Sequence, residues 1–375
     1  MRLFIIAIIF ASLNAPCDAQ KLPSKKSILQ NMRLANSYFM NKWPDTKKEI
    51  YVESKKRSWP SHIWTRAVYY EGLMALYSVD RKKEYYDYAV DWSAKHDWGL
   101  RDGIKTRNGD NQACGQTYID LYLIDKKEER IKDIKASIDL MVASDKKDDW
   151  WWIDALQMGM PVFTKLGVIY NDTSYFRKMY DLYSYTKYKQ GTNGLYNQQE
   201  HLWWRDKDFV PPYKEPNGED CYWARGNGWV VAALVRTLDL LPKTDPHYNE
   251  YLENFQQMCD ALLPLQRTDG FWNVSLNDST HFGGKELTGT SLFTYGFSYG
   301  VRKGWLDKKK FMPAIVKAWN GLADCVHPDG FLGYVQGTGK EPKESQPVNY
   351  DRIPDFEDFG LGCFLLAGSE VYKLR

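Results

Sequence analysis

The sequence has little of what marks several classes of protein. Its 375 residues carry a formal net charge of +2 and contain no block of basic residues, which argues against a nucleic-acid partner. Its six histidines and six cysteines show neither Cys-x-x-Cys pairs nor His-rich spacing, so we expect no metal site and no cofactor. Alternating strand patterns are nearly absent, as are long linkers rich in proline or serine. These absences favour one helical domain.

The apolar stretch near the N-terminus is too short to span a bilayer. Arg2 supplies a positive end, residues 3–13 are apolar, and residues 17–19 end in alanine, which suits signal peptidase. We expect residues 1–19 to be a signal peptide and residues 20–375 to be a single exported domain, periplasmic or secreted, without membrane attachment. The five cysteines of that domain are odd in number and widely spaced, which favours buried free thiols.

Aromatic residues, in contrast, are abundant. They make up 15% of the chain, with 15 Trp and 26 Tyr, and an apolar content of 43% is enough for a sizeable core. The face of an indole packs well on the C–H face of a sugar ring, so this enrichment favours a protein that holds carbohydrate. A large helical core filled with aromatic side chains is the alternative.

Apolar residues recur with the helical period along most of the chain and predict about twelve helices. Some segments, such as 230–241, are apolar nearly all round, whereas others, such as 84–95, have one charged face, which suggests inner and outer helices. Glycines followed by large apolar residues recur at Gly194, Gly270 and Gly330, with spacings of 76 and 60 residues. A repeat of this length predicts an all-α toroid of six helical hairpins, the (α/α)6 barrel, around a central cleft.

Two aspartates are the candidates for chemistry on a glycosidic linkage. Asp154 follows three tryptophans at 150–152 and precedes an apolar helix, so partial desolvation can raise its pKa and let it donate a proton. Asp110 begins another helix in the run Asn-Gly-Asp-Asn of residues 108–111, where a like-charged neighbour across the cleft would leave one proton on the pair. An ordinary helix cap is the alternative for each.

Residues 221–229, Cys-Tyr-Trp-Ala-Arg-Gly-Asn-Gly-Trp, place two indoles and a guanidinium before an apolar helix. We expect Arg225 to pair with a sugar carboxylate or to orient Asp154, and Trp223 and Trp229 to stack on a sugar ring. The alternatives are a salt bridge between helices for Arg225 and core packing for the tryptophans, above all for Trp229.

Two other segments offer substrate contacts. His201 precedes two tryptophans and is a candidate hydrogen-bond partner for sugar hydroxyls, unless it is bound to a neighbouring carboxylate of its own loop. Residues 285–293, Lys-Glu-Leu-Thr-Gly-Thr-Ser-Leu-Phe, form a hydroxyl-rich helix entrance around Thr288. Backbone N–H groups there can hold a carboxylate, or the segment is a plain helix cap.

The motifs resemble those of a known family. Trp152-x-Asp154, the Trp-Ala-Arg-Gly-Asn-Gly-Trp run of 223–229 and the Glu-x-Thr-Gly-Thr run of 286–290 are similar, in this order, to the unsaturated uronyl hydrolases of glycoside hydrolase family 105, with family 88 a more distant relative. The resemblance implies an (α/α)6 barrel and a substrate that a polysaccharide lyase has left with a C4=C5 double bond in its terminal uronic acid.

The resemblance also implies roles for individual residues. Asp154 would protonate C4 and then activate the water that adds at C5, after which the hemiketal rearranges and releases the next sugar. Asp110 would hold substrate hydroxyls and tune Asp154, while Trp152 and His201 would contact the substrate. The expected partner is therefore an oligosaccharide that ends in an unsaturated uronic acid.

Two other functions stay open at this point. A conventional inverting glycosidase would place two carboxylates roughly 6.5–9.5 Å apart across the cleft. A non-catalytic glycan-binding protein would use the tryptophans without Asp154. Basic residues in the candidate substrate loops, Arg205, Lys207 and Lys214, favour a sulfated sugar next to the uronate, as in ulvan, and leave rhamnogalacturonan and arabinogalactan fragments as further candidates.

Overall fold

The computed structural model describes residues 21–375, so the predicted signal peptide lies outside the described part. Within residues 21–375 there are twelve helices of at least 11 residues, together with one short helix, α4 (Gly109–Gln112). The twelve are α1 (Lys25–Lys42), α2 (Trp64–Val79), α3 (Lys83–Lys95), α5 (Cys114–Asp125), α6 (Lys132–Val142), α7 (Asp154–Tyr170), α8 (Thr173–Tyr188), α9 (Ala224–Leu240), α10 (Tyr248–Leu262), α11 (Leu287–Lys303), α12 (Lys308–Ala323) and α13 (Asp358–Leu374).

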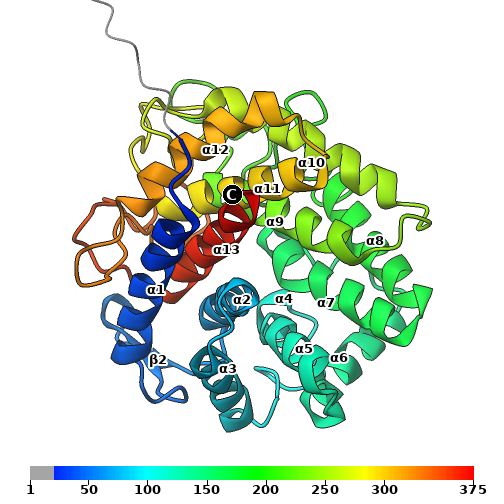
Figure 1. Ribbon diagram of the computed structural model, residues 1–375. Helices are drawn as coiled ribbons and strands as arrows, with labels where there is room; N and C mark the ends of the chain where they lie inside the picture. Colours follow the sequence, from blue (N-terminus) through cyan, green and yellow to red (C-terminus); the bar gives the residue numbers. More distant parts are fainter. Residues whose placement is uncertain (1–20) are drawn as a thin grey trace, which may run out of the picture.

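Six of these helices form a closed inner ring. Helix α2 contacts α5, and the contacts continue through α7, α9, α11 and α13 back to α2. The alternate helices α1, α3, α6, α8, α10 and α12 surround this ring (Figure 1). The predicted (α/α)6 barrel is therefore confirmed.

The two rings follow from the distribution of apolar residues. In the inner helix α11, every residue from 287 to 301 is buried, whereas the outer helix α10 buries one face, with Tyr248, Tyr251, Phe255 and Leu262 among its buried residues. A helix that is apolar all round must be covered on all sides, and a helix with one apolar stripe can face water on the other.

The glycine repeat marks the point where each loop passes an outer helix. Gly194, Gly270 and Gly330 all have positive φ, at 82°, 91° and 99°. A Cβ at Gly270 would lie 2.4 Å from the backbone oxygen of Lys317 in α12, and the other two glycines approach α8 and α1 as closely. Only glycine tolerates both conditions, which explains why the sequence repeats it.

A small hairpin was not predicted. Strands β1 (Ile50–Val52) and β2 (Arg57–Trp59) pair antiparallel, with Tyr51 opposite Ser58. Each strand has three residues, too few to show an alternating pattern. The hairpin carries Trp59 to the cleft described below.

The buried free thiols are confirmed: Cys114, Cys221, Cys259, Cys325 and Cys363 are all free and buried. None of the helices in residues 21–375 combines the length and apolar character needed to cross a bilayer.

Candidate active site

A cleft of about 250 Å³ opens at the N-terminal ends of the inner helices α2 and α7. This volume is slightly below the ~300–1,000 Å³ of sites for drug-sized ligands, so it suits a single sugar ring. A second hollow of about 800 Å³ adjoins it through Lys55, Thr338 and Phe356, which line both, and offers room for further sugars. The residues lining the cleft are Lys55, Trp59, Ile63, Trp64, Arg101, Asp110, Trp152, Asp154, Met158, Arg205, Thr338, Gly339 and Phe356.

Three of the predicted site residues meet in this cleft: Asp110, Trp152 and Asp154. Asp154 is the first residue of α7, and Asp110 lies in the short helix α4, where its backbone N–H donates to Asn108 Oδ1 across 2.8 Å. Helix α4 packs on the first turn of α7, because Gly109 has no side chain to separate them: a Cβ there would lie 3.3 Å from Ala155 O. This contact holds the two aspartates in one site.

Arg205 is a site residue whose role was missed. It was predicted as a cation of a substrate loop, but its Nε donates to Asp154 Oδ2 at 3.1 Å and its Nη1 donates to Asp206 Oδ2 at 2.7 Å. The backbone adds a second link, because Ile153 N–H donates to Arg205 O across 3.0 Å. Arg205 and Asp154 are about fifty residues apart in sequence, so only the fold shows that they are partners.

The electrostatics of the site favour a proton on Asp110. Burial and, as the second cause, the negative charge of Asp154 raise the pKa of Asp110 to about 7, while Arg205 and Arg101 oppose the shift. Asp154, in contrast, is ion-paired with Arg205. The raised pKa that the structure shows in this pair is that of Asp110. The expected pairing of two like charges is present, because Asp154 acts on Asp110.

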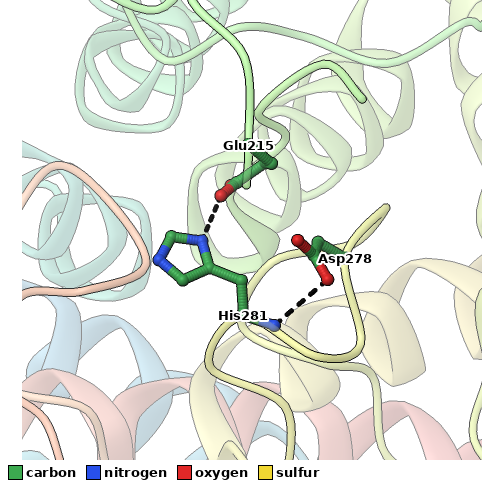
Figure 2. Close-up of side chains that lie close together, drawn as sticks. All are labelled: Glu215, Asp278 and His281. Atoms are coloured by element: carbon green, nitrogen blue, oxygen red, sulfur yellow. Dashed lines mark hydrogen bonds and ion pairs between the residues drawn. The ribbon is translucent and has the colours of Figure 1, made fainter. Parts of the chain in front are cut away.

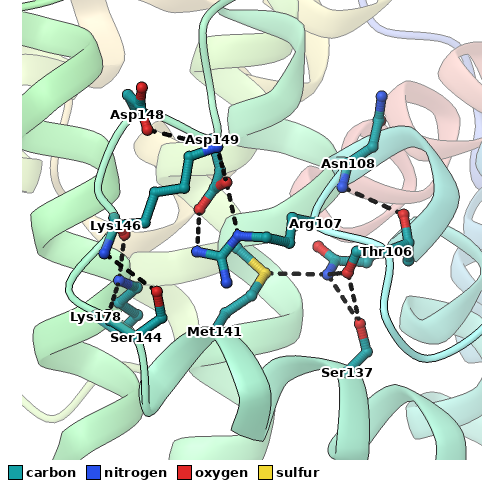
Figure 3. A network of polar contacts seen from close by, with 11 residues as sticks. Thr106, Arg107, Asn108, Ser137, Met141, Ser144, Lys146, Asp148, Asp149 and Lys178 are labelled. Atoms are coloured by element: carbon teal, nitrogen blue, oxygen red, sulfur yellow. Dashed lines mark hydrogen bonds and ion pairs between the residues drawn. The ribbon is translucent and has the colours of Figure 1, made fainter.

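A half-buried ion pair joins the two segments that carry the aspartates (Figure 3). Arg107, three residues before Asp110, donates to both oxygens of Asp149, from Nε at 2.8 Å and from Nη2 at 2.5 Å. The Asp149 side chain is only 2% exposed and lies five residues before Asp154. Lys178 of α8 donates to the backbone oxygen of Ser144 at 2.6 Å and so ties the segment before α7 to α8. The loops before α4 and α7 are thus held in one arrangement.

The structure corrects the predicted contacts of the 223–229 motif. Trp223, Arg225 and Trp229 are at most 1% exposed and do not line the cleft. The Arg225 guanidinium donates to the backbone oxygens of Gln336 and Gly337, each at 2.8 Å, and Trp223 Nε1 donates to Gln336 Oε1 at 3.0 Å. The motif therefore supports the loop that brings Thr338 and Gly339 to the cleft, and its own two indoles and guanidinium are covered by the chain.

The other two predicted contacts also lie outside the cleft lining. Thr288 is fully buried, and its backbone N–H and that of Gly289 donate to the Glu286 carboxylate at 2.8 Å each. The backbone N–H groups of this helix entrance thus bind the carboxylate of Glu286. This is a plain helix cap, the alternative given for the segment. His201 is half-buried and its Nδ1 lies 3.0 Å from the hydroxyl of Tyr196. Its partner is therefore a residue of the same loop, and it is a tyrosine hydroxyl where the alternative had named a neighbouring carboxylate.

One group of side chains has the composition of a metal site (Figure 2). Glu215, Asp278 and His281 place one potential ligand atom each within 4.8 Å of the others, and His281 Nδ1 contacts the Glu215 carboxylate. Asp278 Oδ1 already accepts from the backbone N–H groups of Thr280 and His281, at 2.9 and 3.1 Å. The group therefore links two loops, and none of its three residues lines the cleft. More than sixty residues separate Glu215 from Asp278, which is why spacing did not reveal it.

Comparison with known proteins agrees with this architecture. The profile described as Glycosyl Hydrolase Family 88 matches residues 31–375. The unsaturated 3S-rhamnoglycuronyl hydrolase of Formosa agariphila is 33% identical over 332 residues, which cover 83% of this chain and 85% of that protein.

Two solved structures are similar along nearly the whole chain. A glycosyl hydrolase of family 88 from Bacteroides vulgatus has a TM-score of 0.84 at 29% identity and covers 94% of this chain and 100% of that one. A structure titled as a polysaccharide lyase has a TM-score of 0.83 at 31% identity, with 93% and 97% of the two chains covered. The family match over most of the chain, with the barrel and its cleft carboxylates, identifies the protein as a glycoside hydrolase that belongs to glycosyl hydrolase family 88.

Proposed function

We propose that this protein removes the terminal 4,5-unsaturated uronic acid from oligosaccharides that a polysaccharide lyase produces. The observation that carries the proposal is the pair Asp110 and Asp154 in a cleft of one-ring size, with a carboxyl group whose pKa lies near neutral pH. Hydration of an alkene needs one group that delivers a proton and one that accepts a proton from water, and two carboxyls in different charge states provide both.

The proposed reaction begins with a proton from the carboxyl pair. This proton adds to C4, the positive charge develops at C5 and the ring oxygen, and water adds its hydroxyl at C5 while its second proton returns to the pair. The resulting hemiketal opens, and the glycosidic oxygen leaves with the next sugar. Arg205 donates to Asp154 and orients its carboxyl for the step that takes a proton from water. Trp152, in the cleft wall, covers the ring.

The substrate we propose is an unsaturated uronate linked to a rhamnose-type sugar. The support comes from the two curated relatives, in Formosa agariphila and an Alteromonas species, that are named unsaturated 3S-rhamnoglycuronyl hydrolases. Fragments of rhamnogalacturonan and arabinogalactan type are the other candidates. We further propose that the protein is exported, with residues 1–19 removed. Sequencing the N-terminus of the mature protein tests this, because cleavage must leave Gln20 first.

The reaction is tested by the ultraviolet absorbance of the conjugated alkene. We expect absorbance to fall when the protein is mixed with a lyase digest of ulvan, and a slower fall or none with digests of the other polysaccharides. If no digest of ulvan, rhamnogalacturonan, arabinogalactan or glycosaminoglycan loses absorbance, the proposal is wrong.

A lyase is the second candidate, because one of the similar structures is titled as a polysaccharide lyase. The same assay separates the two functions by the sign of the change. A lyase creates the C4=C5 double bond, so absorbance would rise on intact polysaccharide, whereas the hydrolase lowers it on the digest. A rise on intact ulvan without a fall on its digest would favour the lyase.

A further inference from the structure

A uronate brings a negative charge into a cleft that already holds two carboxyl groups. Such a charge is costly to remove from water unless a cation with hydrogen-bond donors receives it. The cleft lining contains three cationic side chains, Lys55, Arg101 and Arg205. Arg225, which the sequence suggested for this role, is buried behind the cleft and bonded to backbone oxygens.

Two of the three cations are already engaged. Arg205 donates to Asp154 and to Asp206, and its side chain is only 14% exposed. The Lys55 amino group lies 3.3 Å from Asp355 Oδ2 and donates to Thr338 Oγ1 at 3.1 Å. Part of the charge and of the donor capacity of each cation is thus already committed to a carboxylate of the chain itself.

Arg101 differs from both. Its only carboxylate contact within residues 21–375 is with Asp102, at 3.9 Å, which is too long for a hydrogen bond. Asp102 is 63% exposed and is already the acceptor of a 2.8 Å bond from Asn111 Nδ2. The Arg101 guanidinium lies 5.5 Å from the centre of the Trp59 ring, in the range of a cation–π contact, which limits its motion while its N–H groups stay available.

Arg101 is also placed beside the reacting groups. It lines the same cleft as Asp110 and Asp154 and belongs to the loop that leads into α4. Its positive charge reaches Asp110, because it is one of the groups that lower the pKa of that carboxyl. A carboxylate held by Arg101 would therefore stand next to the carboxyl pair, as the C5 substituent of the unsaturated ring must.

We propose that Arg101 binds the carboxylate of the unsaturated uronate through a bidentate pair and thereby selects acidic over neutral terminal sugars. The inference rests on the proposed hydrolysis of unsaturated uronyl oligosaccharides. The planar guanidinium matches the two carboxylate oxygens, whereas an ammonium group forms a single point contact. Arg101 is a substrate-binding residue in this assignment and takes no part in proton transfer.

The test compares two substrates and four proteins. The substrates are an unsaturated uronyl disaccharide and its methyl ester, which keeps the alkene and loses the charge. The proteins are the wild type, Arg101→Gln, Arg101→Lys and the control Arg57→Gln. Arg57 is exposed, stacks 4.3 Å from the same Trp59 ring and does not line the cleft, so its removal takes away a similar charge outside the site.

We expect Arg101→Gln to lower kcat/KM on the acid by about 10- to 150-fold, which is the usual effect of losing hydrogen bonds to a charged group. The kcat/KM on the ester should change by less than about threefold. Arg101→Lys should recover part of the loss on the acid, and Arg57→Gln should leave both substrates unchanged. Equal loss on the two substrates, or none on the acid, overturns the proposal.

Binding gives a readout that does not depend on turnover of the ester. In the Asp154→Asn background, calorimetry should show that Arg101→Gln weakens binding of the acid and leaves binding of the ester unchanged. The reverse, or an equal effect on both, counts against Arg101. A wild type that acts on no unsaturated oligosaccharide would refute the proposed function itself. A wild type that acts on the acid, with Arg101→Gln keeping its preference for acid over ester, would refute only the role of Arg101.

Discussion

Arg205 donates a hydrogen bond from Nε to Asp154 Oδ2 across 3.1 Å and, from Nη1, a second bond to Asp206 Oδ2 across 2.7 Å. One guanidinium thus neutralises two buried carboxylates, 9% and 2% exposed, and one of them faces the cleft. Asp110, in the same cleft, has no ion-pair partner within residues 21–375, and burial and the charge of Asp154 raise its pKa to about 7. The same kind of side chain therefore meets two environments, an ion pair at Asp154 and a raised pKa at Asp110.

Replacing Asp154 tests the acid–base pair directly. Asp154→Asn should lower kcat by at least 10²-fold, the lower range for removing a general acid or base, and leave the thermal midpoint and substrate binding close to wild type. Absorbance assays measure kcat, scanning calorimetry the thermal midpoint and titration calorimetry the binding. Activity within tenfold of the wild type would remove Asp154 from the reaction.

The pH dependence should report Asp110. A carboxyl with a pKa of about 7 is protonated below that pH and loses its proton as the pH rises through it. If the proton is required, kcat/KM falls about tenfold per pH unit above roughly pH 7. Asp110→Asn should lower the rate and abolish this descending limb, while Asp208→Asn, at a 53% exposed aspartate of the surface, should keep it. An unchanged limb in Asp110→Asn would assign it to another group.

Loss of Arg205 should affect both stability and titration. Arg205→Gln leaves Asp154 and Asp206 buried without their cation, which costs about 3–5 kcal/mol of unfolding free energy. Because Arg205 lowers the pKa of Asp110, its removal should also move the descending limb to higher pH. Urea unfolding and pH–rate profiles measure the two effects, and Arg205→Lys, which keeps the charge, is the control. A limb that moves to lower pH would contradict the electrostatic account.

The ion pair between Arg107 and Asp149 should matter for catalysis although neither residue lines the cleft. Asp149→Asn weakens the link between the loops that carry Asp110 and Asp154, so we expect a loss of about 1–3 kcal/mol in stability and a lower kcat with little change in KM. The adjacent Asp148→Asn is a matched control, because Asp148 is 52% exposed and its one ion pair within residues 21–375 is with Lys146, at 3.6 Å. Equal effects of the two substitutions would mean that the half-buried pair has no special role.

The buried carboxyl group of Glu71 should make the stability of the protein depend on pH. Its carboxylate, inside the barrel, accepts from Gln157 Nε2 at 2.9 Å, and burial raises its pKa from 4.5 to about 7. The folded state then binds more protons than the unfolded state between these values, so stability should fall by about 3 kcal/mol as the pH rises from 4.5 to 7. Glu71→Gln should flatten this part of the stability curve in urea titrations at several pH values. Glu53→Gln, at an exposed position, should leave the curve as it is.

Several features of this protein were determined by the sequence alone. The number of long helices and the alternation of inner and outer rings follow from apolar periodicity, because each helix must bury its own apolar surface. The loop glycines predicted the repeat, since the positive φ and close approach at Gly270 and Gly330 exclude other residues. Asp154 was predicted from the three tryptophans that precede it, Asp110 from its place at a loop-to-helix junction and Trp152 from the family resemblance, and all three line the cleft.

The tertiary structure decided the partners of these residues. Trp223, Arg225 and Trp229 were expected to touch the substrate, but indole and guanidinium groups serve equally well inside a protein when carbonyl oxygens and aromatic rings surround them. Sequence pattern records the chemical character of a side chain and not the direction in which it points. The same reason hid Arg205: its partner Asp154 is distant in sequence, and charge pairing depends on distance in space.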